Sequence, residues 1–187
     1  MCQAGIAVEI REILLRDKPA ALIAASAKAT VPVLVLPEGR VFDQSLDIMR
    51  WALERNDPAD WLGAADLAEQ QALIEHNDGP FKTLLDRYKY PQRFPERGAQ
   101  SYRDEAVERV LMPLERRLGC SSHLLGPRCS LADMALLPFI RQFVAVDAAW
   151  FGSAAPLPRL HDWMNRLLAS PLFDSVMQKR PVWQAGV

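Results

Sequence analysis

The chain has 187 residues, of which 50% are hydrophobic and 24% charged, and its 22 basic and 23 acidic residues leave a formal net charge of −1. This balance argues against a protein that binds mainly nucleic acid, because phosphate neutralisation requires a basic surface. The apolar content argues against disorder. No apolar run approaches the ~18–20 residues that span a bilayer, and the first residues show no signal-peptide pattern. We expect a globular protein of one or two domains, with neither nucleic acid nor a membrane as partner.

The three cysteines are Cys2, Cys120 and Cys129, and they form no Cys-x-x-Cys pair. An odd number without framework spacing is typical of free thiols in a reducing compartment, so we expect a cytoplasmic protein. Cys120-x-x-His123 with Cys129 falls short of the three or four ligands at recognised spacing that zinc requires. We therefore expect no metal.

The first part of the chain predicts mixed α/β structure. The expected elements, in chain order, are a strand over 7–15, a helix over 19–26, strands over 30–36 and 40–43, and a helix over 45–53. Alternating apolar side chains favour the first strand, and Pro19 suits the first turn of a helix. The turn residues Glu38-Gly39 between two short apolar runs indicate a β-hairpin.

The rest of the chain has a helical pattern. Apolar residues recur at three- and four-residue steps over 65–90, where Gly79-Pro80 must kink or divide the helix. Ser101-x-x-Asp104 and Ser130-x-x-Asp133 resemble capping boxes that open helices, and Gly119 suits the end of the first of these. Further helices are expected over 134–146, 160–168 and 172–177. The expected domains are 1–56, a linker over 57–64, and an all-helical domain over 65–187.

Two places in the first part could bind a ligand. Val31-Pro32 lies in a predicted strand, where base rates favour a trans bond. In the strand–helix–strand–strand–helix order of a thioredoxin-like fold, however, a cis proline would turn the backbone N–H and C=O of Val31 towards a small peptide. Ser45 is an ordinary N-cap on the simplest interpretation, but a helix N-terminus also suits a carboxylate. Gln44 can orient a neighbouring ammonium.

These residues belong to three motifs that resemble the glutathione S-transferase family: Lys28–Leu34, Val41–Ile48 and Ser130–Ala135. The resemblance implies a truncated thioredoxin-like βαββα domain followed by an all-α bundle, and a homodimer. It implies transfer of the glutathione thiolate to a small electrophile, or exchange with a disulfide. Glutathione would lie against Val31, Pro32, Gln44 and Ser45. Lys18 or Lys28 could reach its second carboxylate, and we take Lys18 as the candidate contact.

The same resemblance implies a strand and a helix ahead of residues 7–15, with a Ser, Tyr or Cys between them that acts on the thiol. The opening Cys2-Gln3-Ala4-Gly5 is similar to the tail of that helix. We expect the first strand and most of the first helix to be missing, which leaves the catalytic residue unknown. Cys2 lacks surroundings that favour a thiolate. The alternative function is a catalytically silent family member that acts as a dimeric helical interaction module.

Basic and aromatic residues alternate over 86–97, a pattern that a nucleic-acid groove can show. At a net charge of −1 we expect a helix end and a loop instead. Such a stretch could line a second-substrate cleft or a subunit contact.

Overall fold

The computed structural model of this chain describes residues 1–184. The chain forms two compact units: Met1–Ala59 with the described part of Pro171–Val187, and Asp60–Ser170. The segment after Ser170 thus belongs to the first unit, a division that differs at this end from the helical domain expected over 65–187. Residues 185–187 of that expected domain lie outside the described residues. No helix in residues 1–184 is both long and apolar enough to cross a membrane.

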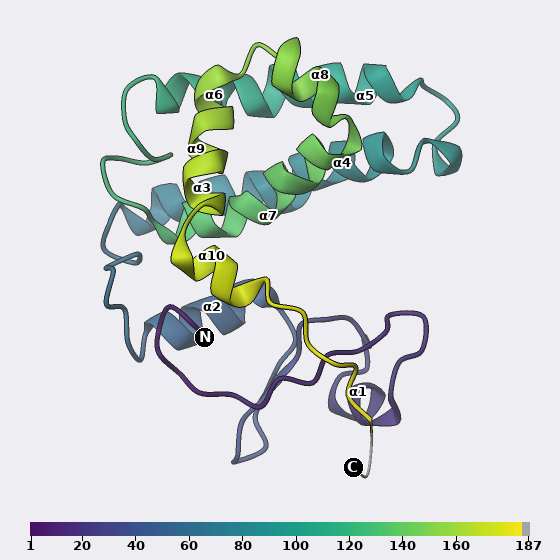
Figure 1. Cartoon of the computed structure of the whole chain (residues 1–187), viewed down its shortest axis with the longest axis vertical. Helices are drawn as coiled ribbons and strands as arrows, with labels where there is room; N and C mark the ends of the chain where they lie inside the picture. Colours follow the sequence, from purple (N-terminus) through teal and green to yellow (C-terminus); the bar gives the residue numbers. More distant parts are fainter. Residues whose placement is uncertain (185–187) are drawn as a thin grey trace. The chain divides into compact units, whose positions relative to one another are not determined.

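The first unit consists of a short hairpin with helices. Its elements are α1 (Ala20–Ala25), β1 (Leu34–Val35), β2 (Val41–Phe42), α2 (Ser45–Leu53) and α10 (Pro171–Val176) (Figure 1). The two strands are antiparallel, with Leu34 opposite Phe42. The N–H of Gly39 donates to the carbonyl of Leu36 at 2.8 Å, and Gly39 has a φ of +88°, which glycine adopts without a steric penalty. The predicted hairpin and its turn are confirmed.

The strand predicted over 7–15 is wrong. This segment forms only isolated bridges, a parallel one between Glu12 and Val182 and an antiparallel one between Leu14 and Asp17. Side-chain alternation indicates which residues share a face, but a strand also needs a neighbour that supplies a ladder of backbone hydrogen bonds. No such ladder partner lies beside this segment within residues 1–184.

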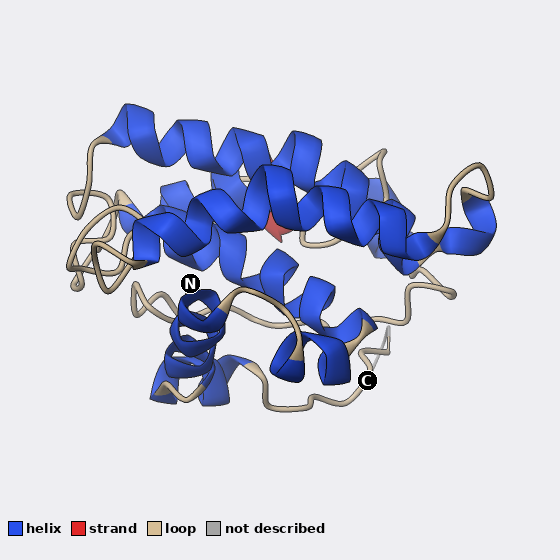
Figure 2. Ribbon diagram, turned by 90° about the horizontal axis from the view of Figure 1, so that it is seen from above, coloured by secondary structure: helices blue, strands red, loops and turns tan. Residues whose placement is uncertain are grey.

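The second unit is helical (Figure 2). Its elements are α3 (Leu67–His76), α4 (Lys82–Lys89), a 3₁₀ turn (Pro91–Arg93), α5 (Ala99–Ala106), α6 (Met112–Leu118), α7 (Leu131–Val146), α8 (Ala148–Ser153) and α9 (Pro158–Leu168). A π-helical turn, Asn77–Phe81, joins α3 to α4, and another, Val107–Leu111, joins α5 to α6. Because Pro80 has no N–H to donate, the first of these turns replaces the kink or break expected at Gly79-Pro80.

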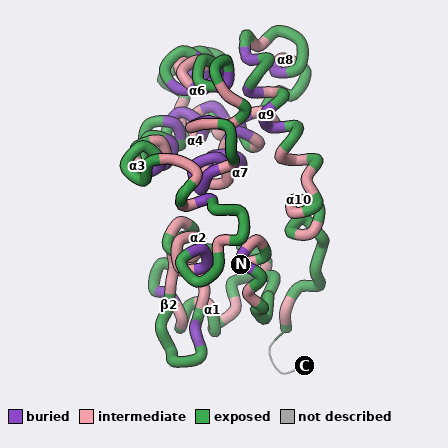
Figure 3. The backbone as a smooth tube through the Cα atoms, turned by 90° about the vertical axis from the view of Figure 1, so that its left-hand side faces the viewer, coloured by how far each residue is buried: buried purple, intermediate pink, exposed green. Residues whose placement is uncertain are grey.

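The core of the second unit forms where these helices pack together. Helix α4 packs against α5 and α7, and α6 packs against α9. The buried segments of these helices are visible in Figure 3. The ring of Phe143 on α7 lies 5.9 Å from that of Phe81 and 5.1 Å from that of Tyr88, measured between centroids. This aromatic contact fastens α7 against the α3–α4 pair.

One of the two predicted capping boxes is confirmed. Ser130 caps α7, and its backbone and side chain form the reciprocal bonds with Asp133 that define the box. Helix α5, in contrast, begins at Ala99, so Ser101 lies inside the helix and the box predicted at Ser101–Asp104 is wrong. The Oγ of Ser101 instead accepts a hydrogen bond from the guanidinium of Arg97 at 2.7 Å.

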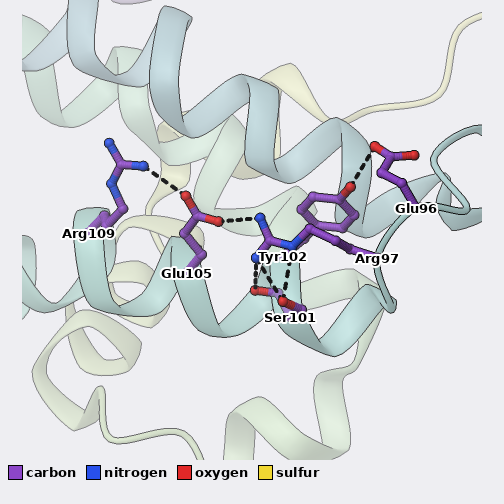
Figure 4. A network of polar contacts seen from close by, with 6 residues as sticks. All are labelled: Glu96, Arg97, Ser101, Tyr102, Glu105 and Arg109. Atoms are coloured by element: carbon purple, nitrogen blue, oxygen red, sulfur yellow. Dashed lines mark hydrogen bonds and ion pairs between the residues drawn. The ribbon is translucent and has the colours of Figure 1, made fainter.

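Figure 4 shows the polar network in which that bond takes part. Arg97 also pairs with Glu105 at 2.7 Å, and Glu105 accepts a hydrogen bond from Arg109 at 2.8 Å. Nearby, the hydroxyl of the buried Tyr102 donates to Glu96 at 2.7 Å. Because Glu96 and Arg97 precede α5 and their partners lie on it, the network attaches the loop before α5 to that helix. Arg97 and Arg109 together hold the pKa of the Glu105 carboxyl below its usual value.

Candidate functional site

The Val31–Pro32 peptide bond is cis, which settles the alternative that the sequence left open. Val31 is 47% exposed. β1 begins only at Leu34, and within residues 1–184 the backbone N–H and C=O of Val31 form no hydrogen bond. A free backbone donor and acceptor on one exposed residue can pair with the backbone of a peptide ligand.

The second candidate group lies at the start of α2. The N-cap of this helix is Gln44, and Ser45 is its first helical residue, so the N-cap interpretation of Ser45 is off by one position. Gln44 and Ser45 are both exposed, and within residues 1–184 neither side chain has a hydrogen-bond partner. The first N–H groups of a helix and a free hydroxyl together suit a carboxylate. Asp47, in the same first turn, already places one negative charge there.

Asp43, in the loop that leads into α2, forms an ion pair with Lys28. Lys28 Nζ donates to Asp43 Oδ1 at 3.1 Å, and the hydroxyl of the buried Ser26 donates to Asp43 Oδ2 at 3.1 Å. The hydrogen bond from Lys28 is the main reason that the pKa of the Asp43 carboxyl lies below its usual value. Since Asp43 directly precedes Gln44, this pair fixes an ammonium next to the residues that open α2.

The structure separates the two candidate lysines. Lys18 is exposed and precedes α1, and within the described residues its side chain contacts no polar partner. Lys28 is held by Asp43. Both lysines are candidates in the sequence, and Lys18 is the one that we expected to bind. The contact between Lys28 and Asp43 distinguishes them, and because it spans 15 positions, no local sequence pattern could reveal it.

A cavity of about 600 Å³ in the first unit is lined by Val31 and Pro32 and by apolar residues of the segment over 8–15 and of α1. Ile48 of α2 lines it too. Residues three apart on a helix lie on the same face, so Ile48 and Ser45 share one face of α2. The free backbone of Val31 and the opening turn of α2 therefore border the same region of this unit.

None of the three cysteines lines this cavity. Cys2 Sγ lies 3.3 Å from Ser175 Oγ, and neither residue lines the cavity. Cys129, in the second unit, is partly buried near Asp133, and both effects raise the pKa of its thiol to about 12. Within the described residues, no three His, Cys, Asp or Glu side chains gather as metal ligands do.

One residue that lines the cavity had no signal in the sequence. Trp183 lies on the wall of the cavity that Val31 and Pro32 share. Its position follows from a backbone hydrogen bond, from the Trp183 N–H to the carbonyl of Glu12 at 2.8 Å. A contact across such a separation leaves no periodicity that a sequence pattern could show.

Residues 2–55 match the glutathione S-transferase N-terminal domain, and residues 71–166 match the glutathione S-transferase C-terminal domain. No curated protein matches the sequence.

Three solved structures share the fold. A ternary complex of BphK, a bacterial glutathione S-transferase, is 19% identical with a TM-score of 0.78, covering 94% of this chain and 88% of that one. A glutathione transferase family member from Pseudomonas fluorescens Pf-5 with two glutathione bound is 17% identical with a TM-score of 0.76, covering 92% and 82%. Glutathione S-transferase-I bound to lactoylglutathione is 24% identical with a TM-score of 0.71, covering 92% and 87%. The two domain matches show that this chain belongs to the glutathione S-transferase family.

Proposed function

We propose that this protein binds glutathione in its first unit and brings the thiol to a second substrate. The observation that carries the proposal is the cavity whose wall contains Val31, Pro32 and Ile48, with Ser45 on the same face of α2 as Ile48. A free backbone N–H and C=O at Val31, together with the N-terminus of α2, matches the needs of an extended peptide with a terminal carboxylate. A solved family member with two glutathione bound has the same fold.

Each part of glutathione has a counterpart in this arrangement. The backbone of its cysteine pairs with the N–H and C=O of Val31, beside Pro32. The α-carboxylate of its γ-glutamyl end accepts from Ser45 and from the first N–H groups of α2, and the side-chain carbonyl of Gln44 orients the neighbouring ammonium. The γ-glutamyl carboxylate at the start of α2 also takes a lysine, and Lys28 is favoured over Lys18 there because Asp43 already holds its ammonium beside α2. The glycyl carboxylate lies at the other end of the tripeptide and is left without an assigned partner.

The chemistry that follows from binding is that of a thiolate. Loss of the thiol proton gives a nucleophile. Its sulfur forms a bond to the electrophile while the leaving group departs with its electron pair, or it forms a mixed disulfide while a second thiolate departs. The side chain that assists proton loss is unassigned. Partners in this proposal are a small electrophile or a disulfide and a second copy of the chain, in a cytoplasmic setting.

Thermal unfolding with and without millimolar glutathione tests the proposal. A ligand at about 100 times its Kd adds ~2.7 kcal/mol to the free energy of unfolding, which raises the Tm of a chain of this size by about 5–10 °C. Ser45→Ala should lose most of the shift, whereas Ser121→Ala, in a loop of the second unit, should keep it. Cooperative unfolding without any shift would overturn the proposal and favour the silent interaction module.

A further inference from the structure

The first unit buries little of its apolar surface (Figure 3). Within residues 1–184, the buried apolar residues of this unit are Ala4, Leu36, Ala52 and Leu53. Large branched residues on the wall of the 600 Å³ cavity remain 38–53% exposed: Val8, Ile10, Val31 and Val35. A folded chain seldom leaves such a group of apolar side chains in water unless a binding partner covers it.

These apolar residues border a gap between two stretches of backbone. Three residues of one stretch, Val8, Glu9 and Arg11, line both the cavity of about 600 Å³ and a second cavity of about 1110 Å³. The stretch Val33–Val35 lines both cavities too. We call the space between residues 8–11 and Val33–Val35 the slot. It belongs to the first unit alone.

One wall of the slot is the free edge of β1. The N–H of Leu36 donates to the carbonyl of Arg40 at 2.9 Å, so the next pair along, Val35 opposite Val41, is a non-hydrogen-bonded pair. The N–H and C=O of Val35 therefore point away from β2. In the described part of the chain they have no hydrogen-bond partner, and neither have those of Val33. No residue of β2 lines either cavity, so this free edge faces the slot.

The opposite wall is also backbone without partners. Over 8–11, no backbone N–H or C=O forms a hydrogen bond within residues 1–184, and Glu12 is the next residue that does. Charge on this wall is balanced, because Arg11 pairs with Glu9 at 2.8 Å. Free donors and acceptors on both sides of an apolar gap suit an extended strand, which pairs along both of its edges while its side chains alternate between its two faces.

We propose that the slot takes a β-strand of about five residues from another polypeptide. The strand pairs with Val33 and Val35 along one edge and with residues 8–11 along the other, and its uncharged, apolar side chains fill the two cavities. This inference goes beyond glutathione binding, because the strand leaves the backbone of Val31 free. Its test contains no glutathione, so each proposal can fail without the other.

A synthetic strand tests the slot. The probe is the fluorescein-labelled peptide amide Lys-Val-Ile-Val-Leu-Val-Lys, and its binding to the whole chain is measured by fluorescence anisotropy. A control peptide has the same side chains but carries N-methyl groups on every second amide, which removes the donors along one edge only. Because a strand inside the slot uses both edges, the control should bind about tenfold or more weakly.

Two results with these peptides would overturn the proposal. Equal binding of both peptides would do so, since apolar adhesion and pairing along a single edge both survive the methylation. Absence of binding by the unmethylated peptide at about 1 mM would do so as well.

Two proline variants of the same hairpin distinguish its edges. Val35→Pro removes the free N–H on the slot side, whereas Val41→Pro removes the matching N–H on the outer edge of β2, and neither N–H belongs to the ladder between the strands. Val35→Pro should weaken binding of the peptide about fivefold or more, and Val41→Pro should leave it unchanged. An equal effect of the two variants would contradict the strand site.

Amide exchange keeps the test decisive if Val35→Pro fails to fold. In the unaltered chain, the peptide should slow exchange of the Val35 amide and leave that of Val41 unchanged, as NMR would show. Unchanged exchange at Val35 with the peptide bound would overturn the pairing. A dimer that forms without the peptide and that Val35→Pro dissociates would assign this edge to a second copy of the chain, which also overturns the proposal.

Discussion

The indole N–H of Trp163 donates to Asp133 Oδ1 at 2.8 Å, and both side chains are fully buried. The same carboxylate accepts from the backbone N–H of Leu124 at 3.0 Å, and from the N–H and hydroxyl of Ser130 at 3.0 and 2.6 Å. Four donors surround this buried carboxylate, which satisfies its oxygens inside the core. The residue that completes the cap of α7 thus also joins that helix to α9 and to the preceding loop.

Asp133→Ala should destabilise the protein strongly. It leaves the Trp163 indole N–H and the Leu124 N–H buried without an acceptor, and such losses cost ~3–5 kcal/mol together. The Tm should fall by about 10 °C or more, as measured by circular dichroism. Asp133→Asn keeps one acceptor oxygen and should lose less. Asp162→Asn, an exposed acid on α9, is the control, and an equal loss there would contradict this account.

A second buried carboxylate, that of Glu115 on α6, caps the N-terminus of another helix, α9. Glu115 of α6 accepts the N–H groups of Arg159 and Leu160 at 3.1 and 2.8 Å, at the first turn of α9, whose own N-cap Leu157 offers no side-chain acceptor. Glu115→Ala removes both acceptors and a favourable charge at a helix N-terminus, so we expect a loss of ~2–3 kcal/mol in urea unfolding.

Two variants check that this loss comes from the cap. Glu115→Gln, which retains one acceptor oxygen, should lie between the wild type and Glu115→Ala. Glu108→Ala removes an exposed glutamate from the π-helical turn directly before α6 and should change the midpoint little. If Glu115→Gln were as unstable as Glu115→Ala, the cap would depend on charge alone.

The three thiols should differ in reactivity. Burial, with Asp133 nearby, raises the pKa of the Cys129 thiol from its ordinary 9.0 to about 12, whereas Cys2 and Cys120 are exposed. Ellman's reagent at pH 8 should therefore label Cys2 and Cys120 quickly and Cys129 only after unfolding. Rapid labelling of all three in the folded protein would contradict the burial of Cys129.

The same pKa shift predicts a pH dependence of stability. The folded protein keeps the Cys129 thiol protonated up to a pH near 12, whereas the unfolded chain loses that proton near 9. The contribution of Cys129 is thus fully present below pH 9 and is lost as the pH rises towards 12. Cys129→Ser should show a flatter decline in the urea midpoint over this window.

The two lysines make distinct predictions for glutathione binding. Lys28→Ala should weaken binding about tenfold or more, because a charge-assisted hydrogen bond contributes ~1.5–3 kcal/mol. Lys18→Ala should leave the Kd nearly unchanged. Isothermal titration of both variants decides between them, and the reverse order would return the contact to Lys18. Because Lys28 holds the pKa of Asp43 low, Lys28→Ala should also raise that pKa, as an NMR titration of the carboxyl would show.

Signals that act within a few residues were predicted well from the sequence. Helix α2 spans Ser45–Leu53 as predicted, and the hairpin turn at Glu38-Gly39 is confirmed. The capping box at Ser130 is confirmed because its bonds join groups three positions apart. The box predicted at Ser101 failed because α5 begins at Ala99, which leaves Ser101 inside the helix. Helix α8 went unnoticed, although its local signal exists: Asp147 accepts the N–H of Trp150 at 3.0 Å.

The motifs of the sequence indicated the family by resemblance. The sequence by itself also determined the helical second unit and the extent of α2, because caps, turns and apolar periodicity are short-range effects. Tertiary structure alone decided that residues 7–15 form no ladder, that Lys28 meets Asp43, and that Glu115 caps α9. It also placed Trp183 on the cavity wall. Each of these outcomes depends on a donor and an acceptor far apart in the chain, and their meeting is fixed only when the whole unit folds.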